Sequence, residues 1–206
     1  APAAPGTPNL ADASDTGSSN SDNITNDTTP QFTGTCETGT TVTLTSSGSG
    51  ALTPTGICSG GDFDITLSSL SANTHNITAT QADTAGNSSL ASSPLSVTID
   101  TTAAAPSTPD LATASDTGTL NTDDVTMDTT PQFTGTCETG ATVTLSSSVD
   151  GALTPTGSCS GGNYAITTTL TENTHNVTAA QTNVAGNTSA ASSGLSVTVD
   201  STDPNV

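Results

Sequence analysis

The stretch DTTPQFTGTCETG at residues 27–39 decides the fold, and it returns unchanged at residues 128–140. Two other stretches repeat at almost the same interval: LADASDTG at residue 10 returns as LATASDTG at residue 111, and NTHNITA at residue 73 returns as NTHNVTA at residue 173. The intervals are 101, 101 and 100 residues, so one residue is missing from the second copy before Asn173. Self-similarity at a fixed period indicates tandem structural repeats. The sequence therefore predicts two copies of one domain, residues 1–101 and 102–206.

Both ends of the chain read like the segment that joins the two copies. APAAPGTP at residues 1–8 resembles AAAPSTP at residues 103–109, and VDSTDP at residues 199–204 echoes IDTTA at residues 99–103. This phase predicts two units taken from a longer array of repeats. A natural two-domain protein is the alternative.

The charge of the chain is one-sided. The 206 residues include no Lys or Arg and 19 Asp or Glu, which gives a formal net charge of −19. Such a chain cannot neutralise phosphates, so nucleic acid is excluded as a partner, and anionic membrane surfaces are disfavoured. No apolar run approaches the length of a membrane span, so no membrane insertion is expected. Without permanent cations, each carboxylate must be solvated, bonded to N–H groups or bound to a metal ion.

Short segments with a period of two make up each copy, and no segment has helical periodicity. Alternation of apolar and polar residues predicts strands with one buried face. In the first copy these segments are residues 31–36, 41–46, 62–70, 75–81 and 95–100. About seven short strands in about 100 residues predict an all-β fold, two tandem immunoglobulin-like β-sandwiches.

The side chains predicted to point inward are mostly aliphatic. They are Phe32, Val42, Leu44, Phe63, Ile65, Leu67, Ile77, Ala79, Leu95, Val97 and Ile99 in the first copy, and Phe133, Val143, Leu145, Tyr164, Ile166, Val177, Leu195, Val197 and Val199 in the second.

One pair of cysteines occurs in each copy with the same spacing of 22 residues. We predict the intradomain disulfides Cys36–Cys58 and Cys137–Cys159, which imply an oxidising, extracellular compartment. Free buried thiols and a metal site are the alternatives. Two cysteines and one distant histidine per copy make a poor zinc site.

Acidic residues gather in the loop before the first long strand of each copy and at the end of the last strand. In an immunoglobulin-like sandwich these two places lie at the same pole, so Asp15, Asp22, Asp27 and Asp100 are expected to converge. Carboxylates brought together repel unless a cation is present, and oxygen ligands without Cys or His select Ca²⁺. The alternative is that these residues only cap turns. The second copy has Asn183 where the first has Asp83, which predicts a weaker or one-sided site.

The motifs DNITNDTTP, GTCETGTTVTL, THNITA and DTAGN, in this order, are similar to the bacterial immunoglobulin-like repeats of large surface adhesins and biofilm-associated proteins. The resemblance covers nearly the whole chain and implies an extender module of an extracellular rod, with Ca²⁺ stiffening the joints. The cysteine pair and the absence of Lys and Arg depart from that family. Carried over by position, the calcium candidates are Asp15, Asp22, Asp27, Asp83, Asp100, Asp116, Asp123, Asp128 and Asp200.

The functional prediction is a structural extender of a cell-surface adhesin or extracellular fibre, and not an enzyme. Its expected partners are neighbouring repeats or identical subunits, with a surface or host receptor bound through other regions. His75 and His175 are interpreted as structural. A self-assembling filament, with residues 1–9 as a linker or donor strand, and a module that binds carbohydrate or a host protein are the alternatives.

Overall fold

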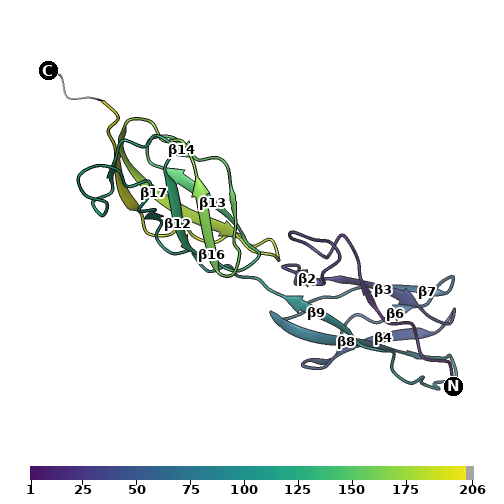
Figure 1. Ribbon diagram of the computed structural model, residues 1–206. Helices are drawn as coiled ribbons and strands as arrows, with labels where there is room; N and C mark the ends of the chain where they lie inside the picture. The colour runs from purple at the N-terminus through teal and green to yellow at the C-terminus, as the bar shows by residue number, and fades with distance from the viewer. Residues whose placement is uncertain (203–206) are drawn as a thin grey trace. The chain divides into compact units, whose positions relative to one another are not determined.

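The computed structural model describes residues 1–202, and this part of the chain is built from strands and loops without a helix. No helix that could cross a membrane is therefore present among these residues. The chain forms two compact units. Residues 1–101 belong to the first unit, and the second unit begins at Thr102. Each unit is a sandwich of two sheets, as the all-β prediction required (Figure 1).

The first repeat has a three-stranded sheet of order β1-β3-β7 and a larger sheet of order β2-β9-β8-β4-β5, with β6 also paired to β4. Strand β2 runs parallel to β9, and the other neighbours are antiparallel. The strands are β1 Asn9–Leu10, β2 Ile24–Thr25, β3 Gln31–Thr35, β4 Thr41–Ser46, β5 Gly50–Ala51, β6 Gly56–Ile57, β7 Asp62–Thr66, β8 Asn73–Ala82 and β9 Leu95–Ile99.

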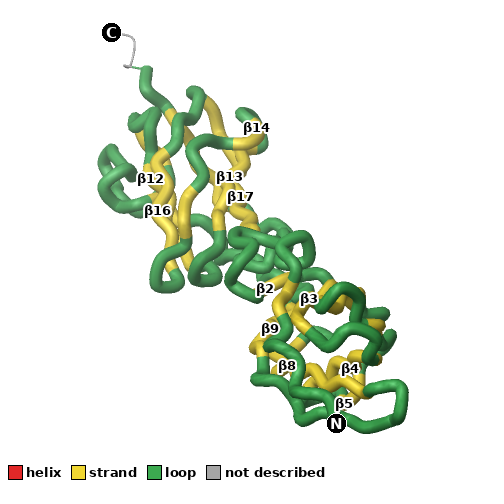
Figure 2. The backbone as a smooth tube through the Cα atoms, turned by 90° about the vertical axis from the view of Figure 1, so that its right-hand side faces the viewer, coloured by secondary structure: helices red, strands yellow, loops and turns green. Residues whose placement is uncertain are grey.

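The second repeat has the same topology, with sheets β10-β12-β16 and β11-β18-β17-β13-β14 and with β15 paired to β13. Figure 2 shows the short strands separated by loops in both repeats. The strands are β10 Asp110–Leu111, β11 Val125–Thr126, β12 Gln132–Thr136, β13 Thr142–Ser147, β14 Gly151–Ala152, β15 Gly157–Ser158, β16 Asn163–Thr167, β17 Asn173–Thr182 and β18 Leu195–Val199.

The predicted alternation decides which side chains form each core. In β7, the sequence DFDIT alternates exposed Asp and Thr with buried Phe63 and Ile65. The predicted inward residues are buried in both repeats, except that Leu95 and Leu195 are only partly buried. The core leucines that the alternation did not identify come from short strands and loops: Leu10, Leu52 and Leu70, and their counterparts Leu111, Leu153 and Leu170.

The residue missing from the second repeat falls just after β16. The first repeat has Leu67 and Ser68 here: Leu67 is buried and donates its N–H to the carbonyl of Pro30, and Ser68 Oγ donates to the carbonyl of Thr53. In the second repeat, buried Thr168 alone occupies this place, and its N–H and hydroxyl make the two equivalent bonds. Strand β7 ends at Thr66, and the next residues turn so that Ser68 N–H bonds to Thr53 O. The strand is therefore shorter than the predicted segment 62–70.

Candidate functional site

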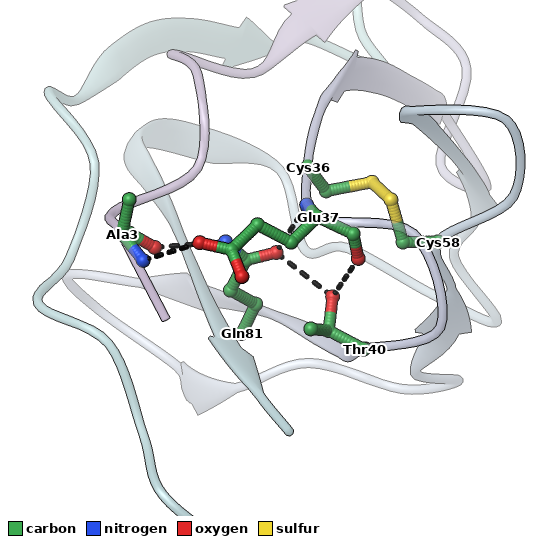
Figure 3. Close-up of a disulfide and its surroundings, with 6 residues drawn as sticks. All are labelled: Ala3, Cys36, Glu37, Thr40, Cys58 and Gln81. Atoms are coloured by element: carbon green, nitrogen blue, oxygen red, sulfur yellow. Dashed lines mark hydrogen bonds between the residues drawn. A yellow bond between two sulfur atoms is a disulfide. The ribbon is translucent and has the colours of Figure 1, made fainter. Parts of the chain in front are cut away.

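Each repeat contains one disulfide, which confirms the predicted pairing. Cys36–Cys58 and Cys137–Cys159 both have Cα atoms 5.9 Å apart, and the described residues include no free cysteine. Cys36 N–H donates to Gly61 O, and Cys58 N–H donates to Thr40 O. The bridge therefore fixes the start of the turn that follows β3, and the Cys58 N–H fixes its end at Thr40 (Figure 3).

The acidic loop of the first repeat is organised around the buried carboxylate of Asp15. Its Oδ2 accepts a hydrogen bond of 3.0 Å from Asn23 N–H, whereas its Oδ1 is buried with no hydrogen-bond partner. Burial raises the pKa of Asp15, and the negative charges of Asp22 and Asp12 raise it further, although the N–H groups of Asn23 and Ile24 lower it. A buried, unpaired carboxylate oxygen is costly, and a cation would satisfy it.

Local backbone geometry holds this loop in place. Asn23 has φ of +60°, a left-handed conformation that Asn tolerates better than most residues. Asp22 Oδ1 accepts from Ile24 N–H, and the buried hydroxyl of Thr25 donates to Ser14 O. These bonds place Asp15 and Asp22 on the same loop beside the short strand β2.

The second repeat reproduces this loop with the same number of carboxylates, since it gains Asp124 and has Thr113 in place of Asp12. Asp116 is buried, its Oδ2 accepts from Asp124 N–H at 3.3 Å, and its Oδ1 again has no partner. Asp124 stands where the first repeat has Asn23 and has the same left-handed backbone, with φ of +57°. Burial raises the pKa of Asp124, and the charges of Asp116, Asp110 and Asp123 add to this. The second loop therefore has a carboxylate, where the first has an amide, beside the buried aspartate.

Other calcium candidates have local partners. Asp27 Oδ1 accepts from the N–H and the hydroxyl of Thr29, and Asp128 and Asp200 cap their turns in the same way. Asp123 Oδ1 accepts from Val125 N–H, as Asp22 does from Ile24. These bonds match the alternative prediction that acids cap turns.

Asp83 is bonded within its own loop. It accepts from Ala85 N–H and from the N–H and amide of Asn87, and these bonds lower its pKa. Asp100 donates its backbone N–H to Thr25 O and so ties the end of β9 to β2.

The predicted acids do not form a complete metal shell inside either repeat. Among residues 1–202, no three His, Cys, Asp or Glu side chains are placed to hold one metal ion. Ca²⁺ takes six to eight oxygens. Each loop has one buried carboxylate oxygen without a hydrogen-bond partner and a second carboxylate near it. These residues could therefore supply one or two of the ligands of a cation, and other oxygens would have to supply the rest.

Both histidines are buried and fully engaged. His75 Nδ1 is 2.8 Å from Ser46 Oγ, and its Nε2 is 2.9 Å from the carbonyl oxygen of Ser71. His175 repeats this with Ser147 and Thr171, and Asp150 Oδ2 lies 3.5 Å from the same Nδ1. A catalytic triad needs the serine and the carboxylate on opposite ring nitrogens. Here both lie at Nδ1, so the described geometry is that of a structural histidine.

A polar cluster beside the disulfide was not predicted. In the first repeat, Ala3 N–H donates to Glu37 Oε1 at 2.7 Å, and Gln81 Nε2 donates to Ala3 O at 2.8 Å (Figure 3). Gln81 Oε1 accepts from Glu37 N–H and from the Thr40 hydroxyl. One signal pointed to it: Gln81 lies at an inward position of its strand, where every other residue from His75 onward is buried.

Comparison with known proteins agrees with this architecture. The family model described as bacterial Ig-like domain matches residues 2–101 and again residues 102–201. No curated relative matches the chain.

Several solved structures resemble the chain at low identity. A biofilm-associated protein BSP domain is 18% identical with a TM-score of 0.34, over 97% of this chain and 30% of that one. The fibronectin(III)-like modules of Clostridium thermocellum CbhA give 13% and 0.40, over 97% and 91%. A 1.5-MDa bacterial ice-binding adhesin gives 20% and 0.44, over 94% and 65%. The chain thus spans less than a third of the first of these structures.

Proposed function

The chain belongs to the bacterial Ig-like domain family, and from this premise we propose that its two repeats are an extender module of a larger extracellular adhesin or fibre. The observation that carries the proposal is that the same sandwich is built twice in tandem, each copy with its own disulfide. Disulfides persist in oxidising compartments, which supports a place outside the cytoplasm. The function of such a module is mechanical: it holds other parts of the protein at a distance.

The N-terminal segment favours the extender over a strand-exchanging filament. Ala3 and Gly6 are hydrogen-bonded to Glu37, Gln81 and Thr35, and Asn9–Leu10 pairs with β3 of the same repeat. A donor strand would instead leave its own domain to complete another one.

Single-molecule pulling of the chain by its two ends tests the mechanical role. We expect two discrete unfolding events, one per repeat, because each sandwich has its own core. Smooth extension without discrete events would contradict the proposal. Antibody labelling of intact producing cells tests the location, and labelling only after cell lysis would contradict it.

We also propose that Ca²⁺ binds at the acidic loops through Asp15 in the first repeat and Asp116 in the second. The support is the buried Oδ1 of each residue, which lacks a hydrogen-bond partner in both copies. The neighbouring carboxylates that raise the pKa of Asp15, and the Asp116 charge that raises the pKa of Asp124, would be neutralised by the same ion. Bound Ca²⁺ would supply positive charge that the chain's own side chains lack.

Calcium titration calorimetry and thermal unfolding test this site. Wild-type protein is expected to bind Ca²⁺ and to unfold at a higher temperature with Ca²⁺ than with EDTA. The double variant Asp15→Asn/Asp116→Asn should lose both effects, whereas Asp62→Asn, an exposed carboxylate on β7, should keep them. No heat of binding and no shift in the wild-type protein would overturn the proposal, and so would an undiminished shift in the double variant.

A further inference from the structure

We propose that each repeat carries a main-chain binding site that anchors the segment preceding its first strand. We call this site the linker clamp and the bound segment the strap. In the second repeat the clamp is Glu138, Gln181 and Asn183, and the strap is residues 102–107. The inference rests on contacts inside one repeat, so it does not depend on the extender role or on calcium.

The clamp contacts only backbone atoms of the strap. Ala104 N–H donates to Glu138 Oε1 at 2.7 Å, and Gln181 Nε2 donates to Ala104 O at 2.8 Å. Asn183 Nδ2 donates to Thr102 O, also at 2.8 Å. Gln181 and Asn183 are two residues apart, as are the carbonyls they bind, so the side-chain amides replace the edge of a neighbouring strand.

Gln181 is preorganised for this role. Its side chain is buried, and its Oε1 accepts from Glu138 N–H at 2.9 Å. This bond fixes which end of the amide faces the strap, because the oxygen is already used and the NH₂ group must point the other way. If the strap left, a buried donor would lose its acceptor, which disfavours release.

The first repeat has the glutamate and the glutamine of the clamp but Asp83 in place of Asn183, and its strap has a different sequence. Glu37 and Gln81 bind both backbone groups of Ala3, and the Thr40 hydroxyl donates to Gln81 Oε1. Recognition through the N–H and carbonyl of a single residue requires no particular side chain. The site therefore accepts both straps of the chain, which read APAAPG at residues 1–6 and TAAAPS at residues 102–107.

The disulfide supports the clamp directly. Cys36 and Cys137 immediately precede Glu37 and Glu138, and each is bridged to the cysteine that directly follows the short strand β6 or β15. Because the bridge fixes the start of the turn, it also restrains the next residue, Glu37, which accepts the strap N–H (Figure 3). The disulfide thus stabilises the position of the glutamate that binds the strap.

The clamp leaves little of the linker outside a domain. Asp100 N–H is bonded to Thr25 O of the first repeat, and Thr102 O is bonded to Asn183 of the second. Thr101 is the single residue between these two anchored positions. We infer that the linker is part of the domain that follows it.

Residue-resolved hydrogen exchange by NMR on the full chain tests the clamp. In the wild-type protein, the Ala104 and Ser107 amides should be protected, since they donate to Glu138 Oε1 and Thr136 O. Gln181→Ala and Glu138→Ala should each speed exchange of both amides roughly tenfold or more by local opening. Glu138→Gln should restore protection, because its amide oxygen still accepts. Glu172→Ala, an exposed glutamate of the same repeat, is the control and should change neither amide.

The fluorescence of Tyr164, the one tyrosine in a chain without tryptophan, reports whether the second repeat remains folded in each variant. Fast exchange at Ala104 in the wild-type protein would overturn the proposal. Unchanged protection in a folded Gln181→Ala or Glu138→Ala protein would also overturn it, as would equal losses in Glu138→Gln and Glu138→Ala. If Gln181→Ala unfolds the repeat, the comparison between the two Glu138 variants decides.

Discussion

The two repeats pair their strands in the same register but differ in the polar groups beside that scaffold. Four of the paired differences place a new polar or charged group in the second repeat, and they are, first repeat before second, Ser49 and Asp150, Phe63 and Tyr164, Leu67 and Thr168, and Asp83 and Asn183. Three of the second repeat's groups have hydrogen-bond partners: Asp150 bonds Thr171, Thr168 bonds Thr154 and Asn183 bonds Thr102. The Tyr164 hydroxyl is the exception, since it is buried without a partner. The scaffold thus accommodates three of these four groups by pairing each with a backbone group or a hydroxyl.

Asp83 and Asn183 show this most clearly. The carboxylate can only accept, and it accepts three N–H bonds inside its own loop. The amide can donate, and it binds the carbonyl of the strap. The sequence interpretation treated this difference as a lost calcium ligand, whereas the structure also shows a gained linker contact.

Truncation at the site of the missing residue should give the largest difference between the repeats. Leu67→Ala removes a buried leucine and should destabilise the first repeat by about 4 kcal/mol. Thr168→Ala removes one buried hydrogen bond and a methyl group, and should cost the second repeat about 1–2 kcal/mol. Calorimetric unfolding of each variant measures both values. Equal losses would contradict the argument that the buried leucine contributes more stability than the threonine in its place.

Removal of the disulfides should affect the repeats equally. Each bridge closes a loop of 22 residues, so Cys36→Ser/Cys58→Ser and Cys137→Ser/Cys159→Ser should each lower the free energy of unfolding by about 3 kcal/mol. Denaturant unfolding follows the losses, with Tyr164 fluorescence assigning the second repeat. A loss confined to one repeat would show that strand packing, not loop closure, decides the effect.

Tyr164→Phe should make the second repeat resemble the first and stabilise it by about 1 kcal/mol, because an unpaired buried hydroxyl is removed. Burial, with the charge of Asp110, raises the pKa of Tyr164 to about 12. Folding therefore favours the neutral phenol, and its contribution is present below the unfolded value near 10 and is lost as the pH rises toward 12. Absorbance titration of this single tyrosine checks the value. Ionisation near pH 10 in the folded protein would contradict the burial argument.

Asp150→Ser should give the smallest effect, because the Asp150 carboxylate is partly exposed to solvent. The hydrogen bonds from Thr171 lower the pKa of Asp150, with a smaller contribution from His175. The stability it contributes is present above the unfolded pKa and is lost as the pH falls through the lower, folded value. At pH 7 the variant should lose less than about 1 kcal/mol, and at about pH 2 it should match the wild-type protein. A difference that persists in acid would contradict this assignment.

The sequence predicted the elements that alternation and repetition control. The long strands, most of the core and both disulfides were predicted correctly, because each depends on local pattern or on spacing. Leu10, Leu52 and Leu70 were missed because they lie on two-residue strands and loops, where no periodicity exists to identify a buried side. The clamp was missed for another reason. Its parts come from residues 3, 37 and 81, and only the folded chain brings them together.

The acidic loops were predicted by composition but not in detail. Counting carboxylates gave Asp15, Asp22 and Asp27 equal weight, yet only Asp15 is buried with an unpaired oxygen. Asp15 is distinguished because the hydrogen bonds of Asn23 and Thr25 close the loop around its side chain. A sequence pattern does not reveal these bonds. Calcium binding at these loops stays a prediction.

The disulfides also limit how long an unfolded repeat can become. A fully extended chain spans about 3.4 Å per residue, so the 22-residue loop between Cys36 and Cys58 holds back roughly 75 Å of contour length. An equal length is held back between Cys137 and Cys159. This length is released only by a reductant, since pulling alone leaves the covalent loop closed. In a protein with such repeats, the maximum extended length would therefore depend on the redox state of its surroundings.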